Sequence, residues 1–142
     1  MRYVDTSIIV KLFVRESRSE EAVAIVRRGD TGLPWTNFHE LEFFNALLLK
    51  QFRDEVTALQ IEDITKRLQN HIEQGVFFRP SIDWHEALRR GGTLSRTHTP
   101  AIGARTRDVI HVAAALTIEA RHFLTFDERQ GALARLAGLQ TD

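Results

Sequence analysis

Apolar and polar residues alternate along the chain with periods that predict its secondary structure. Short apolar runs rich in β-branched and aromatic residues predict strands at residues 2–4, 33–36, 76–79 and 122–126. Segments with apolar residues every three or four positions predict helices at residues 6–14, 17–28, 37–52, 54–74, 83–97, 108–120 and 128–137. Strands separated by helices favour parallel pairing through right-handed crossovers, so the pattern predicts an α/β sandwich.

Residues with capping or chain-breaking tendencies set the limits of these elements. Asn37 and Asp54 are expected to cap the helices that begin there, because both side chains accept hydrogen bonds from free backbone N–H groups. Residues 99–106 are expected to form a loop. No internal repeat, low-complexity tract or long linker interrupts the chain, so a single domain over residues 1–142 is predicted.

Composition excludes several classes of protein. Nineteen basic and nineteen acidic residues cancel, so the net charge gives no case for direct binding to nucleic acid, although a local basic patch is compatible with it. There is no cysteine, which excludes disulfides and thiolate metal sites. No apolar run approaches the ~20 residues of a membrane span. Asp5 interrupts the apolar N-terminal run, unlike a signal peptide, and a cytoplasmic location is expected.

Acidic residues follow two of the predicted strands. Asp5 comes directly after the first strand, and Asp127 comes directly after the apolar run HFLTF. Ligands of parallel sheets bind beyond the carboxyl ends of the strands, which would bring both aspartates to the functional edge. Aspartate is also a favoured N-cap residue, so each could simply cap the helix that follows. The pattern alone leaves both interpretations open.

Asp108 begins a predicted helix that is rich in alanine, in the segment RTRDVIHVAAAL. Its neighbours on the same helical face are His111, Val112 and Ala115, so the carboxylate is expected to point into the protein. A buried carboxylate is costly without a cation or hydrogen-bond donors. Asp108 could be an inward-pointing cap or a metal ligand. His111 fits a hydrogen-bonded core residue better than a ligand.

The segment FHELEFFNAL contains two glutamates two positions apart. A helix turns about 100° per residue, so Glu40 and Glu42 point to nearly opposite sides. The face of Glu42 continues through Asn45 and Ala46, which leave space, whereas the face of Glu40 continues through bulky apolar residues. The helical faces therefore favour Glu42 as the functional residue without deciding the choice.

Several carboxylates in a chain without cysteine favour a hard cation with oxygen ligands. Mg²⁺ and Mn²⁺ bind such sites and retain several waters. The cation would lower the pKa of a water nucleophile and neutralise charge on a phosphate. Carboxylates alone would repel a phosphodiester, so the chemistry would require the metal.

Four segments in this order, YVDTSIIVKLF, HELEFFNALLLK, TRDVIHVAAAL and FLTFDERQ, resemble the PIN-domain ribonucleases, and most closely the VapC-type toxins of bacterial toxin–antitoxin pairs. The resemblance covers nearly the whole chain. It implies a three-layer α/β sandwich in which helices flank a short parallel sheet. It also selects Glu42 over Glu40, because the family's acid precedes the Asn-Ala-Leu segment by three residues.

The resemblance implies a role for individual residues. The catalytic, metal-binding acids correspond to Asp5, Glu42, Asp108 and Asp127. The residues Thr6, Ser7 and Thr125 stand beside these acids and could hydrogen-bond them or a metal-bound water. The basic residues Arg96, Arg105 and Arg107, with His98, precede Asp108 and could either contact RNA phosphates or face solvent.

The activity implied by the resemblance is endonucleolytic cleavage of RNA with Mg²⁺, for which Mn²⁺ would substitute. Members of this family usually form homodimers and are silenced by a small antitoxin, here a VapB-like protein, which would make any contacts with DNA. The apolar faces of the helices at residues 17–28 and 54–74 exceed what one core needs, and part of this surface could bind such a partner. Two alternatives remain: a non-catalytic module of an antitoxin-bound DNA repressor complex, and a related metal nuclease that acts on DNA.

Overall fold

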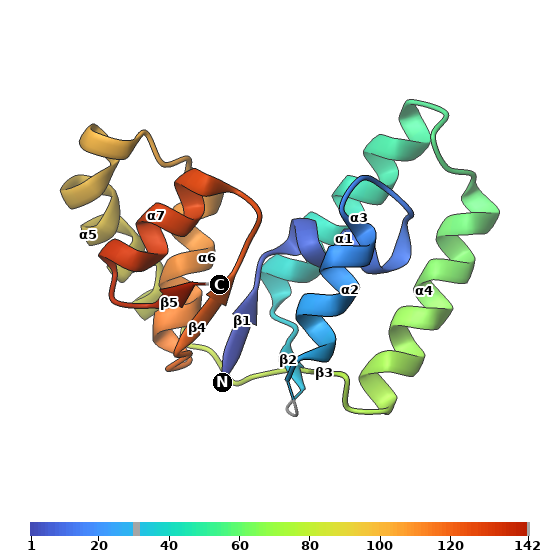
Figure 1. Ribbon diagram of the computed structural model, residues 1–142, viewed down its shortest axis with the longest axis horizontal. Helices are drawn as coiled ribbons and strands as arrows, with labels where there is room; N and C mark the ends of the chain where they lie inside the picture. Colours follow the sequence, from blue (N-terminus) through green and yellow to red (C-terminus); the bar gives the residue numbers. More distant parts are fainter. Residues whose placement is uncertain (30–31, 142) are drawn as a thin grey trace. The chain divides into compact units, whose positions relative to one another are not determined.

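The computed structural model of the protein describes residues 1–29 and 32–141, and these form two compact units (Figure 1). The first unit consists of Met1–Asp5 together with the chain from Pro80 onward, and the second of Thr6–Arg79. Helices alternate with short parallel strands in both units, which confirms the predicted α/β class with a short parallel sheet flanked by helices. Within the described residues, no helix is long and apolar enough to cross a membrane.

The sheet of the first unit has three parallel strands in the order β1-β4-β5. They are β1 (Arg2–Val4), β4 (His122–Leu124) and β5 (Gln140–Thr141). Val4 pairs with Leu124, so β1 and β4 end at the same level. The side chains that alternate along these two strands are buried on both faces, as expected for a parallel sheet covered by helices. The sequence pattern misses β5.

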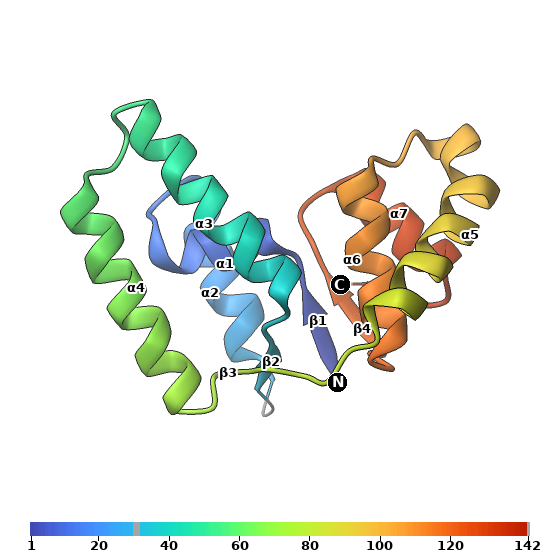
Figure 2. The same cartoon turned by 180° about the vertical axis from the view of Figure 1, so that it is seen from behind.

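Three helices cover this sheet: α5 (Trp84–Ile102), α6 (Thr106–Thr117) and α7 (Glu128–Leu136). Figures 1 and 2 show α7 on one side of the unit and α5 with α6 on the other. The core contains the fully buried Val112, Ala114 and Ala115 of α6 and Leu133 of α7. Gly91 of α5 faces α6, where a Cβ added to it would make van der Waals contact with a methyl group of Val109 at 3.4 Å.

The predicted loop at residues 99–106 is wrong, because α5 continues to Ile102 and only residues 103–105 separate it from α6. Gly103 ends α5 with a φ of 65°, and its N–H donates to the carbonyl of Thr99 at 2.8 Å. Pro100 lies within the last turn of α5 and is exposed, so the carbonyl that lacks its helical partner there can bond to water.

The second unit contains four helices among the described residues, α1 (Thr6–Phe13), α2 (Ser19–Arg27), α3 (Asn37–Phe52) and α4 (Ala58–Glu73). The short strands β2 (Leu33–Pro34) and β3 (Phe77–Phe78) pair in parallel. Aromatic rings fill the core, where Phe43 packs edge-on against Phe13 and Trp35 with centroids 5.4 Å apart in both pairs.

Threonines, not the predicted Asn37 and Asp54, cap α3 and α4. Thr36 accepts a hydrogen bond from the backbone N–H of His39, while the His39 ring accepts one from the N–H of Thr36. Thr57 forms the same reciprocal pair with Gln60 at the start of α4. Asp54 does not cap α4, because it lies three residues before Thr57, in a left-handed turn with a φ of 58°.

Candidate active site

Asp5 lies directly beyond the carboxyl end of β1 and is 8% exposed. Its backbone N–H donates to the carbonyl oxygen of Leu124 at 2.9 Å, which continues the β1–β4 pairing by one residue. The Thr125 hydroxyl lies 3.4 Å from Oδ2 of Asp5. The sequence predicted that Asp5 and Asp127 directly follow the two strands, but β4 ends at Leu124, so Thr125 and not Asp127 is the residue that follows β4 and lies beside Asp5.

Thr125 connects this edge to the start of α7. Its hydroxyl donates to Oε1 of Gln130 at 2.7 Å and accepts from the backbone N–H of Asp127 at 3.0 Å. A hydroxyl has only one hydrogen to donate. The Thr125 hydroxyl therefore donates to Gln130, which is closer than Asp5. Gln130 is 2% exposed and thus fixes the orientation of Thr125.

Asp127 is the N-cap residue of α7, where its Oδ1 accepts a hydrogen bond from the backbone N–H of Gln130 at 2.9 Å. The capping interpretation of Asp127 is therefore correct as far as one oxygen is concerned. A carboxylate has two oxygens with several lone pairs, so a capping bond leaves capacity for a cation.

Asp108 lies in the first turn of α6 and is 2% exposed. Its Oδ2 accepts from the backbone N–H of Arg105 at 2.9 Å, and its Oδ1 lies 3.5 Å from Nε of Arg107. The positive end of the α6 dipole also favours a negative charge here. The N–H of Arg105 and the guanidinium of Arg107 thus stabilise the buried carboxylate, which was expected from sequence to need hydrogen-bond donors or a cation. Arg105 and Arg107 are exposed beside it, and Arg96 is exposed on α5.

His111, one turn beyond Asp108 on α6, was interpreted from sequence as a core residue, and it is 1% exposed. Its Nδ1 lies 2.9 Å from the Tyr3 hydroxyl, and its Nε2 lies 3.7 Å from Oδ1 of Asp5. Sequence reasoning missed this second relationship, because Tyr3 and Asp5 are more than a hundred positions away in the chain. The only available signal was a single polar residue within an alanine-rich helix.

In the second unit, Glu42 and Glu40 have different partners. The Thr6 hydroxyl donates to Oε2 of Glu42 at 2.8 Å, and Thr6 is 4% exposed. Glu40 instead forms an ion pair of 2.6 Å with the exposed Arg79. Ser7 on α1 is exposed. Because Thr6 directly follows Asp5 in the chain, the residue that binds Glu42 is a covalent neighbour of the buried aspartate.

The donor set of the first unit suits a hard divalent cation. It contains carboxylates and a hydroxyl, and the protein has no thiolate to favour a softer metal. Asp5 and His111 belong to a set of potential ligand atoms within 4.8 Å of one another. Over residues 1–29 and 32–141, no such set of three or more includes Asp108 or Asp127, whose carboxylates are turned toward helix N-termini.

Comparison with known proteins identifies the family of the chain. A family model described as the PIN domain matches residues 2–138. A search of curated proteins found no match. The family match extends over Asp5, Glu42, Asp108 and Asp127, the four acids that the sequence motifs single out.

Proposed function

The chain belongs to the PIN domain family, whose members are generally metal-dependent nucleases, and we propose that it is an endoribonuclease toxin of a type II toxin–antitoxin pair. The family supports a hydrolase of nucleic acid that uses a divalent metal. The finer proposal of RNA as substrate and of a VapC-type role rests on the four sequence segments that resemble those toxins.

The observation that carries the proposal is the pair of aligned strand ends in the first unit. β1 and β4 end at the same level, so Asp5, Thr125 and the start of α7 with Asp127 follow one edge of a parallel sheet. Asp5 is buried there, with one carboxylate oxygen 3.4 Å from the Thr125 hydroxyl.

We propose that Asp5, Glu42, Asp108 and Asp127 hold Mg²⁺, with Mn²⁺ as a substitute. When bound, such a cation supplies positive charge for a phosphate and lowers the pKa of water. Thr6 orients Glu42 through its hydroxyl, and Gln130 orients Thr125. Ser7, exposed at the start of α1, would hydrogen-bond one of these acids. The exposed guanidinium groups of Arg96, Arg105 and Arg107 would contact RNA phosphates.

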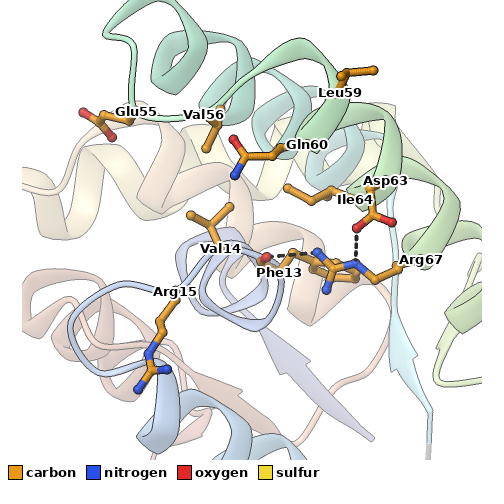
Figure 3. A pocket seen from close by; sticks show the side chains of 10 residues that line it. All are labelled: Phe13, Val14, Arg15, Glu55, Val56, Leu59, Gln60, Asp63, Ile64 and Arg67. Atoms are coloured by element: carbon orange, nitrogen blue, oxygen red, sulfur yellow. Dashed lines mark hydrogen bonds and ion pairs between the residues drawn. The ribbon is translucent and has the colours of Figure 1, made fainter.

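A groove in the second unit supports the proposal of a protein partner. The cavity, about 530 Å³ in volume, lies between the end of α1 and the first half of α4 (Figure 3). Figure 3 shows Val14, Val56 and Leu59 around it, together with the ion pair of Arg67 and Asp63. Leu59 is 77% exposed, which is costly for a free surface and favourable for an apolar helix of a VapB-like antitoxin.

A second apolar surface supports a homodimer. Four residues of α3 spaced by one to seven positions are exposed, namely Leu41, Leu48, Leu49 and Phe52. Phe52 is 85% exposed, and large aromatic side chains are enriched at protein interfaces. We propose that this stripe of α3 packs against a second copy of the chain, and that DNA is bound only through the antitoxin.

Sequencing of RNA ends after expression in cells tests the proposed function. The unaltered protein should produce new RNA ends at a small number of sites, with 5′-phosphate and 3′-hydroxyl groups expected from hydrolysis by water. The Asp5→Asn variant, at the same expression level, should produce none. Cuts in DNA but not RNA would replace the ribonuclease with a DNA nuclease. Toxicity without cuts in either would favour the binding module.

A further inference from the structure

We propose that Tyr3 and His111 form a buried pair that positions the Asp5 carboxylate for binding a divalent cation. This inference rests on the proposed function, since it concerns the same metal site. It assigns His111 a positioning role, neither a metal ligand nor an ordinary core residue. Tyr3 acts through His111, and His111 acts on Asp5.

Three contacts connect these side chains. The Tyr3 hydroxyl lies 2.9 Å from Nδ1 of His111, and Nε2 of the same ring lies 3.7 Å from Oδ1 of Asp5. The other oxygen of Asp5 faces the Thr125 hydroxyl at 3.4 Å. Polar groups therefore flank the carboxylate of Asp5 on both sides, with the hydroxyl of Thr125, just beyond β4, near one oxygen and the ring of His111 on α6 near the other.

The chemistry of the partners fixes the roles of the two ring nitrogens. An ionised carboxylate only accepts hydrogen bonds, so the hydrogen of a neutral His111 ring is best placed on Nε2, facing Asp5. Nδ1 is then an acceptor, and the Tyr3 hydroxyl donates to it. In the opposite tautomer a nitrogen lone pair would face the negative carboxylate, which is unfavourable.

The buried space that Tyr3 and His111 fill does not by itself require polar side chains. Tyr3 is fully buried and His111 is 1% exposed, in a helix whose other buried residues are small and apolar apart from Asp108. The Tyr3 ring already stacks on the Phe123 ring, with ring centroids 5.5 Å apart and an interplanar angle of 12°. A phenylalanine and a leucine would fill similar space without the cost of two buried polar groups. We explain the Tyr3 hydroxyl and the ring nitrogens of His111 by their position beside the Asp5 carboxylate.

Side chains that contact metal-binding carboxylates set the geometry of those carboxylates, and their removal typically weakens metal affinity or activity by about 10- to 100-fold. The same magnitude is expected for His111→Leu, which removes the ring nitrogen that lies 3.7 Å from Oδ1 of Asp5. His111→Gln keeps an N–H donor near the position of Nε2 and should retain most of the affinity. Tyr3→Phe removes only the hydroxyl and should cause a smaller loss, of about 3-fold or more.

The test is a calorimetric titration of the metal-free full chain with Mn²⁺, which gives the affinity. Pulsed EPR spectra of the bound Mn²⁺ show whether a nitrogen atom is a ligand. His85→Leu, which changes an exposed histidine on α5, is the matched control and should bind Mn²⁺ as the unaltered protein does. Thermal unfolding without metal gives the folded fraction of each variant, so affinity is compared per folded molecule.

The outcomes separate this inference from the proposed function. Weaker Mn²⁺ binding by His111→Leu and Tyr3→Phe, restored by His111→Gln, supports the positioning role. Unchanged affinity in His111→Leu overturns it while leaving the metal site in place. A nitrogen coupling to Mn²⁺ that disappears in His111→Leu also overturns it, because His111 would then be a direct ligand. A protein that binds no Mn²⁺ overturns both the inference and the proposed function.

Discussion

Thr6 donates its hydroxyl hydrogen to Oε2 of Glu42 at 2.8 Å, whereas Glu40, two residues earlier on α3, pairs with Arg79 at 2.6 Å. The two glutamates of FHELEFFNAL therefore have different environments. Glu42 accepts a hydrogen bond from the buried Thr6, which follows Asp5 in the chain, and Glu40 forms an ion pair with the exposed Arg79. This difference gives a paired test of which glutamate serves the chemistry.

Glu42→Gln should reduce metal-dependent RNA cleavage by about 100-fold or more, because loss of a ligand should exceed the 10- to 100-fold cost of losing an outer hydrogen bond. Glu40→Gln should leave the rate within about 3-fold and lower the free energy of unfolding by at most ~1 kcal/mol, as for an exposed ion pair. Cleavage of a labelled RNA measures both. A larger loss of activity in Glu40→Gln would mean that the functional face of α3 is assigned wrongly.

Some positions of the candidate acids could be predicted from sequence, because they depend on local periodicity. Residues that end a strand follow from spacing, so Asp5 was placed correctly beyond β1, whereas β4 ends at Leu124 and Asp127 lies further from it than predicted. The role of His111 could not be found in this way. It depends on Tyr3, which lies 108 positions away and meets His111 only after the sheet and α6 pack together.

The errors at element ends have local physical causes. Asn37 and Thr36 are both good N-cap residues, and the choice depends on the His39 ring reaching back to the Thr36 backbone. The strand β5 has two residues, one exposed and neither strongly apolar, and it is defined only by its pairing with β4. Such features have no periodic pattern that a sequence could display.

The buried cap of α3 should stabilise the protein more than the exposed cap of α4. Thr36→Ala removes a hydroxyl that is hydrogen-bonded to His39 and is 1% exposed, so a buried polar partner loses its bond. The expected loss in the free energy of unfolding is about 2 kcal/mol. Thr57→Ala, at a cap of the same type in an exposed position, should cost about 1 kcal/mol or less. Urea unfolding measures both, and an equal or larger loss in Thr57→Ala would contradict the explanation.

Stability should depend on the charge of Glu16. Burial tends to raise the pKa of Glu16, but hydrogen bonds from Lys50 and Lys11 outweigh it and hold the pKa below the usual value of 4.5. A lowered carboxyl pKa contributes stability above pH 4.5 that is lost as the pH falls through the lowered pKa. Glu16→Gln should therefore destabilise the protein near neutral pH by about 1 kcal/mol, and the difference should shrink in acid.

The measurement for Glu16 is urea unfolding of both proteins at about pH 7 and about pH 3. Glu20→Gln is the control, because the Glu20 side chain is 97% exposed and its ion pair with Arg15 is long, at 4.0 Å. It should match the unaltered protein at both values of pH. A difference for Glu16→Gln that is constant with pH would show that the network with Lys11 and Lys50 contributes through packing and not through charge.

The groove of α1 and α4 should be needed for partner binding and not for catalysis. Leu59→Glu places a charge in an apolar part of the cavity lining, so the affinity for the antitoxin should fall by about 10-fold or more, as for loss of an interface contact. Leu88→Glu changes a leucine of α5 that is 58% exposed and is the matched control. Co-purification and calorimetry with the antitoxin report binding, and RNA cleavage should be unchanged in both variants. Full affinity in Leu59→Glu would place the partner elsewhere.

The central claim is that Asp5 serves a metal-dependent nuclease and is dispensable for the fold. Its backbone bond to Leu124 does not involve the side chain, so Asp5→Asn keeps the β1–β4 pairing. The most direct test is cleavage of single-stranded RNA by purified protein with Mn²⁺, with excess chelator, and with Asp5→Asn. The account predicts cleavage only by the unaltered protein with Mn²⁺, and a folded Asp5→Asn variant. Equal cleavage by Asp5→Asn, or cleavage that survives removal of the metal, would contradict it.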